Sequence, residues 1–127
     1  MKIRIKGNFI RYRLTKSEVS ALVETGAIVE ETCFGTEPGQ KFMYTLETRE
    51  DIDHLQADFK EQRITMYLPA DAAKKWPKEE RIGFEYVQNI SPGTDLHLLL
   101  EKDFVCLDET IEDQSDNYPN PHYERKK

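Results

Sequence analysis

The alternation of apolar and charged residues is most regular at the start of the chain. Residues 2–6 read KIRIK and residues 9–14 read FIRYRL, so every second side chain falls on the same side of an extended backbone. Gly7 and Asn8, which stand between the two segments, are typical of a tight turn. The pattern therefore predicts a β-hairpin with one apolar face and one basic face.

A helix is predicted directly after this hairpin, over residues 16–25. Thr15 precedes it and Glu18 follows Thr15 by three residues, which is the spacing of a capping box. Val19 begins a stripe of apolar residues on one helical face. Gly26 stands where a left-handed residue is needed to end the helix.

The rest of the chain predicts mainly further strands, separated by turn residues. These strands cover residues 27–34, 41–48, 55–60, 63–68, 82–90 and 95–105. A second, short helix is expected over residues 69–76, where Pro77 closes it. Because successive strands joined by short turns usually pair with each other, we expect an α+β fold. It would be an antiparallel meander of about eight strands that curls toward a half-barrel, with two short helices and no internal repeat.

The length of 127 residues is that of one domain. Apolar residues thin out late in the chain, so we expect a single α+β domain over residues 1–107 and an acidic tail containing Pro and Asn over residues 108–127. We find no export signal and no apolar run long enough to span a membrane. We therefore expect a cytoplasmic protein in which Cys33 and Cys106 stay reduced and buried.

Two segments carry a resemblance to a known family. Residues 1–19 read MKIRIKGNFIRYRLTKSEV, residues 99–107 read LLEKDFVCL, and residues 115–121 read SDNYPNP. Both ends of the chain resemble a family of short uncharacterised bacterial proteins, and the middle resembles it more loosely. The resemblance implies a free-standing bacterial domain of unknown function, and it implies no catalytic or binding residue.

The basic face of the predicted hairpin is the first candidate site. Its members are Lys2, Arg4, Lys6, Arg11 and Arg13. Neighbouring strands lie about 5 Å apart, and like charges at that distance repel each other. An anion or an acidic partner would reduce this repulsion. A solvated surface with charges screened by salt explains the same pattern.

The C-terminal segment is acidic and forms the second candidate. Asp113 and Asp116 belong to a run of seven acids between residues 101 and 118, and Tyr118 could anchor this run to the domain through its aromatic ring. We expect the tail to lie over the basic hairpin. A disordered, solubilising tail is the alternative.

No catalytic residue, metal site or cofactor is predicted. The three histidines are scattered, the cysteines lack metal-site spacing, and no glycine-rich phosphate loop is present. We expect a small interaction or regulatory module, whose partner is a protein or a second copy of the chain. The net charge of −6 argues against nucleic acid and anionic membranes as partners. The alternative is an enzyme or binder that acts on a phosphorylated small molecule within the curled sheet.

Overall fold

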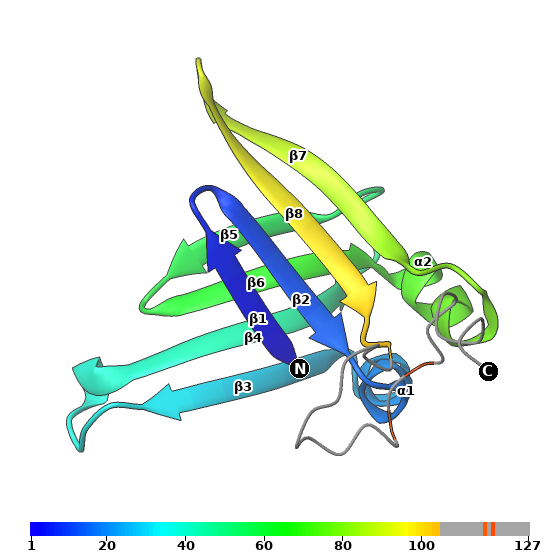
Figure 1. Ribbon diagram of the computed structural model, residues 1–127, viewed down its shortest axis with the longest axis horizontal. Coiled ribbons are helices and arrows are strands. Elements are labelled where there is room, and N and C mark those ends of the chain that lie inside the picture. Colours follow the sequence, from blue (N-terminus) through cyan, green and yellow to red (C-terminus); the bar gives the residue numbers. More distant parts are fainter. Residues whose placement is uncertain (105–115, 117, 119–127) are drawn as a thin grey trace, which may run out of the picture.

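Two four-stranded β-sheets and two short α-helices make up the part of the chain that the structure describes (Figure 1). The structure is a computed structural model, and it describes residues 1–104, 116 and 118. Both helices lie at one end of the molecule, and the hairpins of the two sheets run away from that end in diverging directions. The predicted α+β class is confirmed.

Sheet A combines two hairpins that are far apart in the sequence. Its strand order is β1 (Lys2–Lys6), β2 (Phe9–Leu14), β8 (Thr94–Lys102) and β7 (Gly83–Ser91). Each hairpin is antiparallel, whereas the two central strands, β2 and β8, run parallel. Strand β1 is therefore an edge strand, and it carries three of the five basic residues of the predicted hairpin, Lys2, Arg4 and Lys6.

Sheet B repeats this arrangement with the two hairpins in the middle of the chain. Its strand order is β3 (Ala27–Cys33), β4 (Lys41–Arg49), β6 (Arg63–Pro69) and β5 (Gln56–Lys60), with a 3₁₀ turn at Pro38–Gln40 before β4. Again the central strands, β4 and β6, run parallel. Sheet B is thus one continuous piece of chain, inserted between the two hairpins of sheet A.

The helices connect the sheets and begin and end where the sequence indicates. Helix α1 (Lys16–Thr25) has the predicted capping box: the Thr15 hydroxyl accepts from the Glu18 backbone N–H, and the Glu18 carboxylate accepts from the Thr15 N–H. Gly26 ends the helix with a φ of 82°, which a residue without a Cβ adopts without strain. Helix α2 (Ala70–Lys75) continues into a 3₁₀ turn at Trp76–Lys78.

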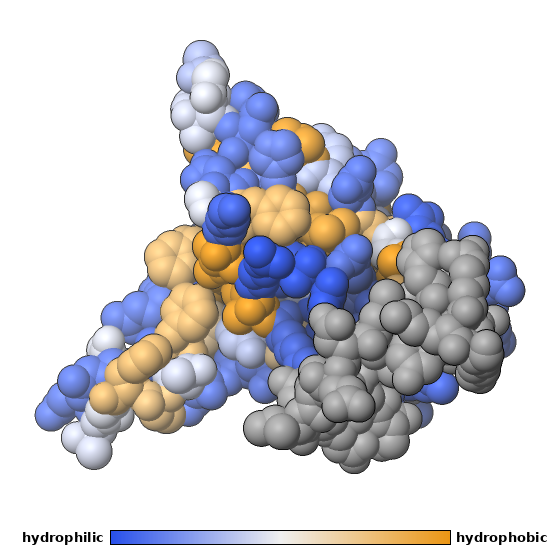
Figure 2. All heavy atoms as spheres, in the orientation of Figure 1, coloured by the Kyte–Doolittle hydropathy of each residue, from blue (hydrophilic) through white to orange (hydrophobic). Residues whose placement is uncertain are grey.

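A single apolar core joins the sheets at the helical end. Its largest fully buried side chains include Trp76, Tyr12, Leu22, Leu46 and Met66. The Tyr12 hydroxyl, buried in this core, donates to the Ile64 carbonyl across the two sheets. At the other end the hairpins diverge, and hydrophobic residues gather in the hollow where the two arms meet (Figure 2).

Two sets of hydrogen bonds join the sheets along their edges. Between β5 and β7, the side-chain amide of Gln88 accepts from the Ala57 N–H and donates to the Ala57 carbonyl, both at 3.0 Å. Near the start of β1, the Tyr44 hydroxyl donates to the Met1 carbonyl at 2.9 Å, and the Met1 amino group lies 2.7 Å from the Glu30 carboxylate. The sheets therefore approach a barrel without closing into one within the described residues.

The prediction of an antiparallel meander is wrong. Each sheet is mixed, because its two hairpins meet through a parallel pair of strands that are not neighbours in the sequence. The pairing of β2 with β8 depends on contacts between segments more than eighty residues apart, and no short sequence pattern reports it. The strand order also repeats between the sheets, although the sequence has no visible repeat.

The expectation that both cysteines are buried is wrong for Cys33, which is exposed and free. It lies at the end of β3, where its thiol contacts the Glu31 carboxylate at 3.3 Å. Cys106 lies outside the described residues. Within the described part of the chain, neither helix is long and apolar enough to cross a membrane.

The Gln88 bridge gives a test of how the two sheets are joined. Replacing Gln88→Leu keeps the side-chain volume but leaves the Ala57 N–H and carbonyl without these partners. We expect the free energy of unfolding to fall by about 1–3 kcal/mol, as measured by urea denaturation.

The matched control is Gln56→Leu on the neighbouring strand β5, where no side-chain hydrogen bond is recorded among the described residues. We expect this change to stay within about 0.5 kcal/mol of the parent. Equal losses in the two variants would show that the amide bridge does not hold the sheets together.

Candidate functional site

The hairpin of β1 and β2 brings the five predicted basic residues onto one region of sheet A. Lys2 lies directly opposite Arg13, and Arg4 lies directly opposite Arg11. Lys6 stands at the end of β1, and its side chain falls on the same strand face as those of Lys2 and Arg4 because side chains alternate along a strand. We call this set the basic face: Lys2, Arg4, Lys6, Arg11 and Arg13.

Like charges therefore stand opposite each other twice in one hairpin, an arrangement that destabilises an antiparallel pair. One carboxylate from the neighbouring strand β8 partly compensates for it. Glu101 lies 3.5 Å from the Arg13 guanidinium and 4.0 Å from that of Arg11. For Arg4 and Lys6, no ion pair is recorded with any residue that the structure describes.

Arg11 is the most enclosed member of the basic face, with 19% of its side chain exposed. Burial, together with repulsion from Arg13 and Arg4, lowers its pKa from the usual value, although Glu101 opposes the shift. Burial and the repulsion from Arg13 and Arg4 thus each disfavour the charged form of the Arg11 guanidinium. A further anion at this face would act in the opposite direction, so the basic face is electrostatically suited to an acidic ligand.

A buried carboxylate links the basic face to the C-terminal segment. Asp103 is only 2% exposed, and its carboxylate lies 3.4 Å from the Lys2 ammonium. The Asp103 carbonyl accepts from the Tyr118 N–H at 2.7 Å, and the Tyr118 ring packs edge-on against Phe104. The end of β8 thus contacts both Lys2 and Tyr118.

Asp116 contacts the first turn of α1. Its carbonyl accepts from the Lys16 N–H at 3.1 Å, and its carboxylate accepts from the Ser17 N–H at 3.3 Å. Hydrogen bonds from Thr15 and Ser17 lower the pKa of the Asp116 carboxyl. Asp113, the third predicted tail contact, lies outside the described residues, so an acidic tail over the whole basic face stays a prediction.

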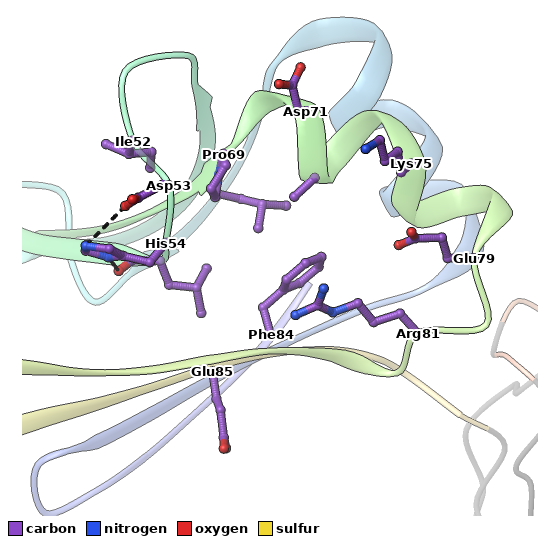
Figure 3. A pocket seen from close by; sticks show the side chains of 13 residues that line it. Ile52, Asp53, His54, Pro69, Asp71, Lys75, Glu79, Arg81, Phe84 and Glu85 are labelled. Atoms are coloured by element: carbon purple, nitrogen blue, oxygen red, sulfur yellow. Dashed lines mark hydrogen bonds and ion pairs between the residues drawn. The ribbon is translucent and has the colours of Figure 1, made fainter.

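A separate polar pocket of about 520 Å³ lies between α2, β7 and the loop before β5 (Figure 3). Figure 3 shows Asp53 and His54 on one side of it, and Lys75 and Glu79 on the side of the helix. The charged residues of its lining are Asp53, Asp71, Lys75, Glu79, Arg81 and Glu85. Acids outnumber bases there, so the pocket is poorly suited to a phosphate group.

Two polar side chains of this pocket, His54 and Arg81, already have structural partners. The His54 ring stacks on Tyr86 with centroids 3.9 Å apart, and its Nδ1 lies 2.9 Å from the Leu55 carbonyl. The Arg81 guanidinium lies 4.0 Å from the centre of the Phe84 ring. Among the described residues, no group of three or more His, Cys, Asp or Glu side chains is arranged to hold a metal ion.

Sequence patterns located the basic residues and counted Glu101 in the acidic run, but they did not place it on the strand beside Arg13. Glu101 falls in a predicted strand, yet its position beside Arg13 depends on the parallel pairing of β2 with β8. The stacking of His54 on Tyr86 also joins distant segments, the loop before β5 and strand β7 of the other sheet.

Glu101→Gln tests the electrostatics of the basic face. The change removes the carboxylate between Arg11 and Arg13, and we expect the free energy of unfolding to fall by about 0.5–1 kcal/mol at low ionic strength. Urea denaturation at increasing NaCl concentration measures the effect. The loss should shrink toward 1 M salt, where charges are screened beyond about 3 Å.

Glu85→Gln on the neighbouring strand β7 is the control, because no ion pair of Glu85 is recorded in the described structure. It should change stability little at any salt concentration. A loss in Glu101→Gln that does not depend on salt would contradict the electrostatic explanation.

Comparison with known proteins places the chain in a family without assigning it a function. No curated protein matches it, and no solved structure matches it. One family model matches residues 1–122, which include the whole described structure, and its description is a family of unknown function. The predicted resemblance to an uncharacterised family is confirmed by this match, and the chain belongs to the family of unknown function DUF7009.

Proposed function

We propose that this domain is a non-catalytic binding module, and that its basic face binds an acidic segment of a partner protein. The observation that carries the proposal is the register of the first hairpin, which sets Lys2 opposite Arg13 and Arg4 opposite Arg11. This arrangement costs free energy in the isolated domain. An acidic ligand would offset this repulsion, and the gain would favour its binding.

The shape of the surface favours an extended protein segment. Strand β1 lies at the edge of sheet A, where its outer backbone groups are placed to pair with an added strand. Side chains on one strand face recur about every 6.6–6.8 Å. A partner with acidic residues at every second position would therefore present one carboxylate to each of Arg4 and Lys6.

The overall charge supports a protein rather than a nucleic acid as the partner. The chain carries a net charge of −6, so a polyanion longer than the basic face would meet repulsion from the rest of the molecule. A short acidic segment with local negative charge avoids this repulsion. We place the module in the bacterial cytoplasm, where reduced conditions suit the free thiol of Cys33.

The alternative function, action on a phosphorylated small molecule inside the curled sheet, draws less support from the described residues. The inner faces of both sheets carry apolar side chains such as Tyr12, Leu98 and Met66. The polar pocket beside α2 has more acids than bases in its lining. Neither the apolar inner faces nor the acidic pocket would offset the charge of a phosphate group.

Arg4→Ala tests the proposal directly. The probe is a fluorescent peptide of alternating Glu and Val, and its affinity is measured by fluorescence anisotropy at several salt concentrations. Arg4 is exposed and has no recorded ion pair among the described residues, so its removal should leave the fold intact. We expect the affinity to fall by about three- to tenfold at low salt, with a weaker dependence on salt, as for other charges at the rim of an interface.

Arg63→Ala, on the outer side of sheet B, is the matched control and should bind the peptide as the parent does. A peptide in which Lys replaces every Glu should not bind. The proposal fails if the parent does not bind the acidic peptide at low salt, or if Arg63→Ala weakens binding as much as Arg4→Ala.

A further inference from the structure

An apolar cleft of about 460 Å³ opens between the inner faces of the two sheets, at the end away from the helices. Every described strand except β3 contributes to its walls. The cleft is lined by Ile5, Ile10, Phe42, Ala57, Asp58, Phe59, Ile64, Gln88, Ile90 and Leu96. In Figure 2 it belongs to the hydrophobic region where the two arms of the molecule meet.

Large apolar side chains stand exposed at this cleft. Ile5 is 52% exposed, Phe59 is 64% exposed and Ile90 is 55% exposed, and they come from three strands, β1, β5 and β7. Exposed apolar residues that converge from two facing sheets differ from single surface residues, and such clusters mark binding grooves. The volume lies within the range of small-molecule sites, about 300–1,000 Å³.

The polar groups of the cleft decide which ligand it can hold. Only two lining side chains are polar, and both are engaged: Asp58 accepts from the Tyr67 hydroxyl at 3.1 Å, and Gln88 bonds to the Ala57 backbone in both directions. A peptide inserted between these walls would bury N–H and carbonyl groups without partners, at a high cost. A hydrocarbon chain makes no such demand.

The mouth of the cleft adds a preference for a negatively charged head. Lys60 directly follows Phe59 at the end of β5, and it is exposed. Lysine places its apolar stem along hydrophobic surface and keeps its ammonium in water, so the Lys60 side chain can reach a carboxylate at the rim.

We infer that the cleft between the sheets binds the hydrocarbon chain of an acyl ligand whose anionic head meets Lys60. This site uses the inner faces of the sheets, whereas the basic face lies on the opposite side of sheet A. The two sites are therefore independent. Occupation of one leaves the residues of the other exposed.

The experiment titrates the full chain with 11-(dansylamino)undecanoate, a fluorescent fatty acid, and then displaces it with unlabelled carboxylates below their micelle concentrations. We expect saturable binding at one site per chain. Affinity should rise from octanoate to dodecanoate by up to about fourfold per added methylene, because each methylene leaves water for an apolar wall. Dodecyltrimethylammonium, which has the same chain and the opposite charge, should bind less tightly.

Two pairs of variants separate the cleft from general surface hydrophobicity. Phe59→Ser and Ile90→Ser each remove an exposed apolar side chain from the cleft, and each should weaken dodecanoate binding about tenfold. The controls are Phe34→Ser and Val87→Ser, which remove side chains that are 73% and 48% exposed and do not line the cleft. They should bind as the parent does.

Three outcomes would overturn the inference. The first is a parent chain with no saturable binding of the fluorescent acid, and the second is an equal loss in the control variants. The third is a parent that is a dimer in sedimentation and becomes a monomer in Phe59→Ser, which would assign the cleft to a second copy of the chain. Displacement of dodecanoate by the acidic peptide would contradict the independence of the two sites, while the absence of displacement supports it.

Discussion

The structure depends on one constraint: the two sheets share an apolar core at only one of their ends. Trp76, Tyr12 and Leu46 are fully buried where the helices cover the strands. Twisted sheets that pack at an angle separate with distance from their contact. Toward the hairpin tips the side chains that continue the core therefore have no facing partner. The Gln88 bridge and the contacts of Met1 with sheet B join the edges of the two sheets.

Local patterns predicted the parts of the fold that local interactions determine. The first hairpin and helix α1 follow from strand alternation, a capping box and Gly26, each of which acts within a few residues. The arrangement of the sheets follows from pairings over long sequence distances, and the pattern of one strand does not say which strand lies beside it. Exposure of Cys33 has the same cause, because it lies where a β-strand extends beyond the sheet that would have covered it.

The candidate sites likewise combine features that local patterns predicted with contacts between distant strands that they did not. Alternation in residues 2–6 assigned Arg4 and Ile5 to opposite faces, and from this the charged and apolar surfaces of β1 follow. Glu101 beside Arg13 and Gln88 beside Ala57 join strands that are distant in the sequence, and no sequence pattern placed these strands side by side. One strand thus serves two surfaces, and a slip of one residue in its pairing would exchange the guanidinium and the isoleucine between them.

The nested order of the strands has a consequence for how the chain acquires its structure. Sheet B is built from residues 27–69 alone, so all its pairings become possible as soon as that segment leaves the ribosome. Sheet A needs its last strand, β8, which is synthesised almost ninety residues after β2. At about 5–20 residues per second, the first hairpin waits several seconds with both edges open. During that interval its positive charges, which repel a second nascent hairpin, protect it from pairing with the wrong chain.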